Sequence, residues 1–145
     1  MEKLKKENLF KVAVYMRIGN PNEIEKDDFV TSQKNIANHI LNEKLKNIII
    51  DYYVDYGYSG IDKNRPEYCR LKKEIFNNKY KVVFASDYSV LNRDFIESII
   101  FLNLLRDNNV SLITQYGTEK EAEFINAMRK EILKIRYSKR RRLKC

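Results

Sequence analysis

The sequence predicts an α/β fold: a mainly parallel sheet with helices on both faces, plus a long C-terminal helix with a basic end. Short runs of β-branched and apolar residues alternate along the chain with segments of helical periodicity. Parallel neighbouring strands need crossover connections, and helices supply them in this order of elements. With 145 residues, 43% of them hydrophobic, we expect a single core.

The first half of the chain begins this alternation. Residues 11–18 (KVAVYMRI) are predicted to form a buried strand that ends at the turn signal of residues 19–21. Apolar residues at helical spacing predict an amphipathic helix over residues 27–46, with acidic residues at its start. A second strand over residues 48–54 then leads into a loop of Gly and Ser residues that ends at Pro66.

The second half continues the pattern. A short helix is predicted over residues 67–77, and a third strand (KVVFAS) over residues 81–86. The polar stretch 87–94 precedes a strongly apolar helix from about residue 93 to residue 107. Its apolar residues cover more than one face, so it is buried on two sides or meets a partner. A fourth strand follows over residues 110–114.

The final segment is predicted to be a long helix. Thr118 and Glu121 have the spacing of a capping box. A single apolar stripe follows them, formed by Ile125, Met128, Ile132 and Ile135. A helix with one narrow stripe leans on the body or on a second subunit along that stripe alone. We therefore expect two parts: a globular domain over residues 1–117, and a helix with its basic end over residues 118–145.

The net charge of +8 lies at the C-terminal end of the chain. Residues 129–145 contain nine basic residues and one acidic residue, so residues 1–128 are neutral. No apolar run approaches the roughly 20 residues of a membrane span, and the N-terminus lacks a signal-peptide pattern. We therefore expect a cytoplasmic protein without membrane contact. The two cysteines and one histidine lack metal-ligand spacing, so neither a metal nor a cofactor is expected.

Three arginines fall where an open parallel sheet binds its ligands. Arg17 is near the end of the first strand, Arg65 lies in the loop after the second, and Arg93 follows the third. Arginine suits bidentate contact with phosphate or carboxylate. The residues alone leave two interpretations open, a phosphate-sized anion site or a set of structural ion pairs. The candidate partners for such pairs are Asp55, Asp87 and Asp94.

At these residues the sequence resembles the N-terminal catalytic domain of the serine recombinases, the family of resolvases, invertases and large integrases. The family's first strand and the helix after it are matched by VAVYMRIG and TSQKN. Its second loop is matched by DYGYSGIDKNRP, and its third strand and following turn by KVVFASDYSVLNRD. The three motifs have the family's order and spacing. The resemblance covers about residues 11–142 and implies a resolvase-like fold.

This resemblance implies a function on DNA. Members of the family attack a DNA phosphodiester with a serine hydroxyl, form a phosphoserine link, and religate the strands after subunit rotation. Such phosphoryl transfer depends on positioned cations and on an activated nucleophile. The phosphate-contacting positions that the resemblance implies are Arg17, Arg65 and Arg93. The supporting polar positions are Gln33, Asp55 and Ser59.

The departures from the family fall on the reacting groups. Gly19 occupies the position of the nucleophilic serine, so no phosphoserine can form there. Ser89 and Val90 replace a carboxylate and a further arginine of the family's pattern. Nearby hydroxyl groups could substitute for the nucleophile, but none stands two residues after Arg17. The candidates are Tyr15, Ser32 and Ser89.

The resemblance also assigns two roles to the long helix. In the family its first half contacts a second subunit, and its later half lies along the DNA minor groove. Here residues 124–135 correspond to the dimer-facing part. The DNA-facing part, called the basic tail below, consists of Arg136, Lys139, Arg140, Arg141, Arg142 and Lys144. No separate DNA-binding domain follows before Cys145, so we expect weak, salt-sensitive binding.

Together these observations predict a recombinase-family domain that binds DNA and does not cleave it. We expect it to act as an accessory or regulatory subunit. Its partners are DNA and either copies of itself, as a dimer or tetramer, or an active recombinase in a heterodimer. Two alternatives remain: an active recombinase with a displaced nucleophile, or an α/β interaction module that binds a partner through the helix near residues 95–105.

Overall fold

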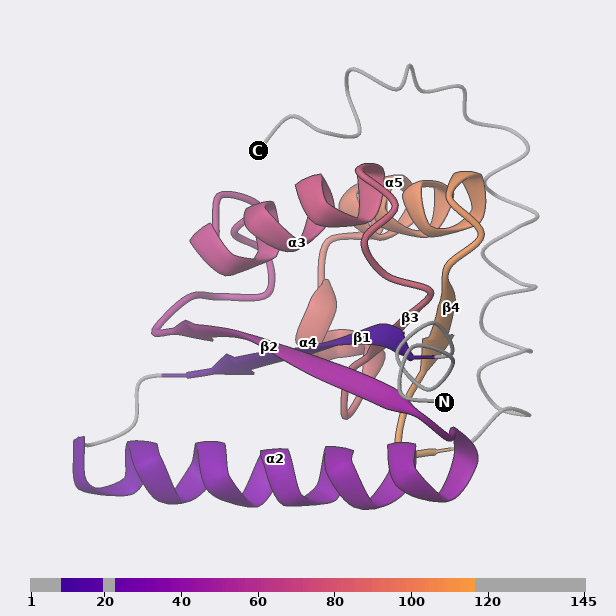
Figure 1. The fold of residues 1–145 in the computed structure, drawn as a ribbon. Helices are drawn as coiled ribbons and strands as arrows, with labels where there is room; N and C mark the ends of the chain where they lie inside the picture. The colour runs from indigo at the N-terminus through magenta and orange to yellow at the C-terminus, as the bar shows by residue number, and fades with distance from the viewer. Residues whose placement is uncertain (1–8, 20–22, 117–145) are drawn as a thin grey trace.

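The computed structural model describes residues 9–19 and 23–116, and its centre is a four-stranded parallel sheet (Figure 1). In chain order the elements are β1 (Phe10–Ile18), α2 (Glu23–Lys44), β2 (Ile48–Tyr56), α3 (Pro66–Phe76), β3 (Val82–Phe84), α4 (Tyr88–Leu91), α5 (Phe95–Asp107) and β4 (Ser111–Ile113). The helix predicted over residues 118–145, with its apolar stripe and the basic tail, lies outside the described residues.

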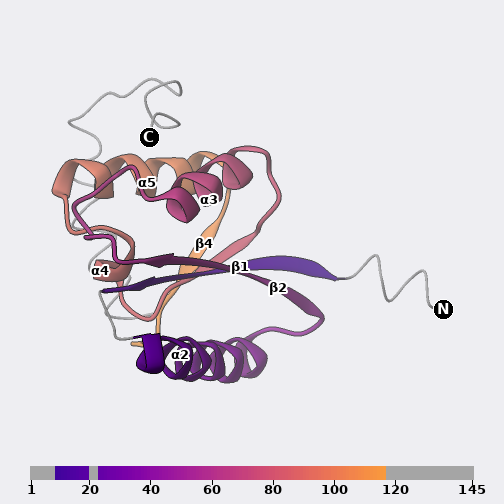
Figure 2. The same cartoon turned by 90° about the vertical axis from the view of Figure 1, so that its left-hand side faces the viewer.

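Helices cover both faces of the sheet. The strand order is β2-β1-β3-β4, and each neighbouring pair is parallel. Figures 1 and 2 show α2 on one face, and α3 with α5 on the other. Helices that cross from one parallel strand to the next produce this layered arrangement. The predicted α/β architecture is therefore confirmed.

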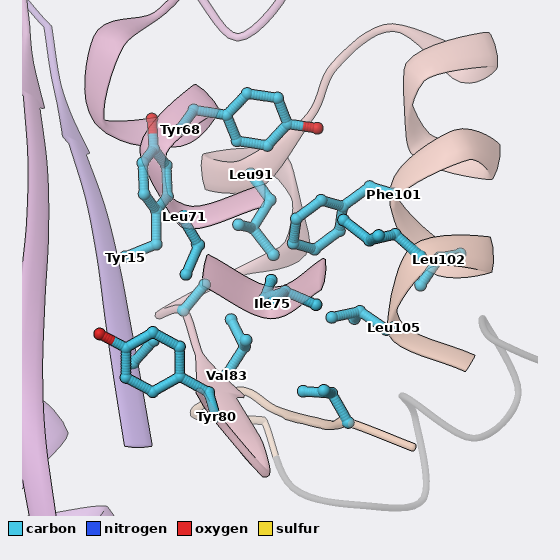
Figure 3. Close-up of a cluster of buried hydrophobic side chains, with 14 of the residues drawn as sticks. Tyr15, Tyr68, Leu71, Ile75, Tyr80, Val83, Leu91, Phe101, Leu102 and Leu105 are labelled. Atoms are coloured by element: carbon cyan, nitrogen blue, oxygen red, sulfur yellow. The ribbon is translucent and has the colours of Figure 1, made fainter. Parts of the chain in front are cut away.

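The alternation of side chains along β1 divides the core into two clusters. Val12, Val14 and Met16 belong to the cluster that packs against α2. Tyr15 belongs to the larger cluster on the face of α3 and α5, as Figure 3 shows. Because successive side chains of a strand point to opposite faces, Arg17 lies on the same face as Tyr15. The strand thus directs Arg17 toward the loops at the carboxyl end of the sheet.

Several boundaries differ from the sequence prediction by a few residues, among them the start of α2 and the end of β2. The helix α2 begins at Glu23 rather than at Asp27, because acidic residues, which favour a helix N-terminus, already occur in the sequence from Glu23 onward. The strand β2 continues two residues further than predicted, so Asp55 is a strand residue and not a loop residue. The chain leaves β2 at Gly57, whose φ of 75° a glycine adopts without strain.

The polar stretch after β3 contains the short helix α4, which the sequence analysis did not predict. Asp87 caps its N-terminus by accepting a hydrogen bond from the Ser89 backbone N–H at 3.0 Å. Four residues are too few to show helical periodicity in a sequence. The next helix, α5, begins at Phe95 after the capping residue Asp94, slightly later than predicted.

The helix α5 is buried over most of its surface, as its apolar composition predicts. Every residue from Glu97 to Leu105 is buried. Glu97 Oε1 accepts hydrogen bonds from Lys72 Nζ at 2.8 Å and from the Tyr68 hydroxyl at 2.9 Å. This buried ion pair joins α5 to α3, because Lys72 and Tyr68 belong to α3. No helix in the described part of the chain is long and apolar enough to span a membrane.

Candidate functional site

The structure brings the three predicted arginines together at the carboxyl edge of the sheet. Arg17 lies near the end of β1 and is paired in register with Asp55 of β2. Arg65 immediately precedes α3, and Arg93 lies between α4 and α5. Their side chains gather around α4 and Gly60. This convergence follows from the parallel sheet, in which the loops after the strands share one edge.

Arg65 is fully buried, and its five N–H groups make five hydrogen bonds. The acceptors are backbone and side-chain oxygens. They are the Asp62 carbonyl (2.7 Å), the Tyr15 hydroxyl (2.9 Å), the Val90 carbonyl (3.3 Å), the Leu91 carbonyl and Asn92 Oδ1 (3.2 Å). The ring of Tyr68 lies 4.1 Å from the guanidinium carbon. Arg65 therefore has no N–H group left for a phosphate, although the resemblance implies a phosphate contact at this position.

Tyr15 connects Arg65 to an acidic partner. Its hydroxyl accepts a hydrogen bond from Arg65 and donates one to Asp55 Oδ2 at 2.8 Å. Burial, the largest cause, raises the pKa of Tyr15 far above its ordinary value, so the hydroxyl keeps its proton and can donate it to the carboxylate. The positive charge of Arg65 and the negative charge of Asp55 are thereby linked through a neutral hydroxyl.

Asp55 also caps the helix α3. Its Oδ1 accepts a hydrogen bond from the Glu67 backbone N–H and its Oδ2 one from the Tyr68 backbone N–H, each at 2.9 Å. These N–H groups lie in the first turn of α3, where the helix has no internal acceptors and where a negative charge is favoured. The N-cap residue, Arg65, supplies no side-chain cap. A buried carboxylate from β2 therefore takes over this task.

Arg17 donates to backbone carbonyls rather than to a carboxylate. Its Nε bonds the Val90 carbonyl at 3.2 Å, its Nη2 the Ser89 carbonyl at 3.2 Å, and its Nη1 the Tyr58 carbonyl at 3.3 Å. Partial burial lowers the pKa of Arg17 first, and the nearby charges of Arg93 and Arg65 lower it further. Arg17 thus lies close to two other positive charges.

Arg93 is exposed and packs against Gly60. The Arg93 backbone N–H donates to the Gly60 carbonyl at 3.0 Å. A Cβ on Gly60 would lie 2.8 Å from Arg93 Cγ and 3.2 Å from Arg17 Nη2, so glycine permits both arginines to approach this loop. No hydrogen bond or ion pair within residues 9–19 and 23–116 uses the Arg93 guanidinium. Its guanidinium is therefore open to an anion there, whereas Arg17 already uses three of its five N–H groups.

The remaining predicted positions have varied surroundings. Gly19 is exposed at the end of β1, and a Cβ there would meet no atom within 4 Å. Ser59 Oγ accepts a hydrogen bond from the Ile61 backbone N–H at 3.2 Å and so shapes its loop. Ser89 is exposed, and its backbone carbonyl accepts a hydrogen bond from Arg17 Nη2. Gln33 lies on α2, on the other face of the sheet, and no hydrogen bond between described residues joins it to the arginines.

The geometry bears on one of the two interpretations that the residues left open, the set of structural ion pairs. The three arginines form no ion pair with any acidic residue in the part of the chain that the structure describes. Their three candidate partners cap helices instead, Asp55 at α3, Asp87 at α4 and Asp94 at α5. The phosphate-sized anion site stays a prediction, and the N–H groups of Arg65 all have protein acceptors in this structure. The described residues also contain no cluster of His, Cys, Asp and Glu that could hold a metal ion.

Sequence reasoning missed the linking function of Tyr15 and the contribution of Asn92. Tyr15 is a candidate substitute nucleophile in the sequence, yet its hydroxyl is buried between two charged groups. A signal for the link was available, since Tyr15 precedes Arg17 by two residues and therefore shares its face of β1. The sequence contains no comparable signal for Asn92, whose buried Oδ1 accepts a hydrogen bond from Arg65 Nη2.

A family model and a curated protein both match this chain. The family model "Resolvase, N terminal domain" matches residues 12–140. A curated protein of Bacillus subtilis (strain 168), named "Putative DNA recombinase", is 27% identical over 131 residues, which make up 88% of this chain and 25% of that protein. The chain therefore spans about a quarter of the length of this relative.

Solved structures support the same fold. The N-terminal catalytic domain of TP901-1 integrase aligns with a TM-score of 0.70 at 20% identity, covering 83% of this chain and 93% of that one. A resolvase family site-specific recombinase from Streptococcus pneumoniae aligns with a TM-score of 0.61 at 20% identity, covering 86% and 89%. At this level of identity the likeness establishes the fold.

The site's dependence on Asp55 can be tested by stability. Asp55→Ala leaves two helix N–H groups and the Tyr15 hydroxyl without an acceptor and removes the buried counter-charge of Arg65. We expect the free energy of unfolding to fall by about 3 kcal/mol in urea titrations. Asp51→Ala is the matched control, because Asp51 lies on the same face of β2 but accepts one bond, from Tyr80. It should cost about 1 kcal/mol. Equal losses would contradict this description.

Proposed function

Because the chain belongs to the resolvase family of serine recombinases, we propose that it is a recombinase domain that binds DNA through the phosphate backbone and does not cleave it. The observation that carries this proposal is the residue at the end of β1. Gly19 lies two residues beyond Arg17, has no side-chain oxygen, and is exposed. Cleavage in this family needs a serine hydroxyl at that position, and phosphodiester chemistry without a nucleophile does not begin.

The other hydroxyl groups offer poor replacements. Tyr15 is buried, and both its partners are charged groups of the core. Ser32 lies on α2, on the opposite face of the sheet. Ser89 is exposed beside Arg17, so it is the residue through which the alternative, an active recombinase with a displaced nucleophile, would have to work.

Contact with DNA is supported by two cationic features. Arg93 presents an open guanidinium at the carboxyl edge of the sheet, where a phosphate oxygen can accept from it. The basic tail concentrates the surplus charge of the chain, and its attraction for DNA would be independent of base sequence. We assign the tail to the DNA backbone on the strength of the resemblance and of this charge.

An accessory role fits a domain of this kind. Such a domain would pair with copies of itself, or with an active recombinase, through the long helix that the resemblance assigns to subunit contact. A mixed dimer would then contain one cleaving and one non-cleaving site. The role is proposed for the domain itself, because the chain corresponds to about a quarter of its curated relative.

Covalent trapping tests the absence of cleavage. Supercoiled DNA is incubated with the protein and quenched with a denaturant, and a protein–DNA adduct is sought. We expect none from the natural chain. Gly19→Ser should also form none, although the added side chain fits, because Arg17 and Arg65 are engaged with α4 carbonyls. An adduct from the natural chain that Ser89→Ala abolishes would establish the displaced nucleophile instead.

The salt dependence of DNA binding tests the contact itself. If Arg93 neutralises one phosphate, Arg93→Ala should reduce the slope of log affinity against log salt by about 0.9. The matched control is Arg106→Ala, which removes the same charge near the end of α5, where Arg106 already pairs with Asp107 at 3.6 Å. Its slope should match that of the natural chain.

Truncation after Ile135 extends this measurement to the basic tail. Loss of DNA retention at low salt would support the proposed contact. Retention unchanged by truncation and by Arg93→Ala would contradict these two contacts, and a natural chain that retains no DNA at low salt would contradict the DNA-binding function and favour the interaction module.

A further inference from the structure

We propose that α4 is an internal gate on the anion site: its backbone carbonyls hold the Nε–H and one Nη2–H of Arg17, and a phosphate binds these two N–H groups only when α4 releases them. The inference rests on the proposed function, since it concerns regulation of the same phosphate contact. It starts from the observation that no anionic side chain neutralises Arg17 or Arg93 in the described chain. Carbonyl oxygens of α4 take the place of anion oxygens.

The chemistry of a helix C-terminus explains why α4 can play this part. The last carbonyls of any helix lack N–H partners within the helix, and they carry the negative end of the helix dipole. In α4 the Ser89, Val90 and Leu91 carbonyls all accept hydrogen bonds from arginines. Arginine side chains are suitable donors for such a C-cap. A phosphate would compete for the same N–H groups with a full negative charge.

The two arginines that cap α4 are not equally free to leave it. Arg65 is fully buried and is also held by Tyr15, Asn92 and the Asp62 carbonyl, so it stays in place. Arg17 is only partly buried, and its remaining bond goes to the Tyr58 carbonyl. The neighbouring charges of Arg65 and Arg93 favour an anion beside Arg17. Arg17 is therefore the arginine that would exchange a carbonyl for a phosphate oxygen.

The helix α4 is short enough to yield. It has four residues, and an isolated helix of this length is unstable without outside support. Its two ends are held by Asp87, which caps the N-terminus, and by the arginines at the C-terminus, and its Leu91 side chain packs in the core. Ser89 and Val90, which replace a carboxylate and an arginine of the family's pattern, carry no charge. Arg17 therefore bonds their backbone oxygens. Weakening the N-cap of α4 should therefore release Arg17 from the α4 carbonyls. The positively charged residues of the site stay unchanged.

Two variants of Asp87 separate the gate from simple electrostatics. Asp87→Ala and Asp87→Asn remove the same negative charge, but asparagine still caps a helix and alanine does not. If α4 competes with the anion, Asp87→Ala should bind inorganic phosphate about fivefold more tightly than Asp87→Asn, the factor that corresponds to a typical cap. Binding is followed by NMR at the Arg17 and Arg93 Nε–H groups. The Asn92 backbone N–H, which bonds the Tyr88 carbonyl, reports on α4.

The outcomes distinguish the gate from the function on which it rests. Phosphate shifts at Arg17 and Arg93, accompanied by a shift at Asn92 and by tighter binding in Asp87→Ala, support the gate. Shifts at both arginines with equal affinity in the two variants, or with Asn92 unchanged, overturn the gate and leave the phosphate contact intact. No phosphate effect on Arg93 in any variant contradicts the proposed function and the gate with it.

Discussion

A buried guanidinium needs an acceptor for every N–H group, and the way in which Arg65 meets this requirement organises the carboxyl edge of the sheet. Its five hydrogen bonds reach the loop before α3, the strand β1, the helix α4 and the residue after it. Breaking a buried ion pair lowers the free energy of unfolding by about 3–5 kcal/mol, because a charged donor is left without a partner in the core. The surrounding segments are therefore fixed relative to one another by this one side chain.

The same requirement determines where negative charge lies. Asp55 balances Arg65 through Tyr15 and also stabilises the first turn of α3, so one carboxylate links the two strands, the loop and the helix. Arg17 and Arg93, on the outer side of this centre, pair with no carboxylate of the described residues. The inner part of the cluster consequently pairs its positive and negative charges, and the outer part carries the positive charges of Arg17 and Arg93. That division is the basis of the phosphate contact proposed above.

The sequence predicted the layers of the fold and the convergence of the arginines, because strand alternation and the strand-end rule depend only on local pattern. It did not predict how the arginines point. The burial of Arg65 depends on Asn92 and on α4 carbonyls that are distant in sequence, and α4 itself is too short to have a periodic signature. Asp55 was expected in a loop, since the extension of β2 depends on its pairing with β1. Gln33 falls on the other face of the sheet for a similar reason, as the position of α2 is a tertiary feature.

The division of roles among the arginines is tested most directly by the exchange of their side-chain Nε–H protons with water, measured by NMR. A buried, hydrogen-bonded N–H exchanges only when the structure opens. The account predicts very slow exchange at Arg65, intermediate exchange at Arg17, and exchange at Arg93 as fast as at a solvent-exposed arginine. Fast exchange at Arg65, equal to that at Arg93, would contradict it, because all three guanidiniums would then be open to a phosphate.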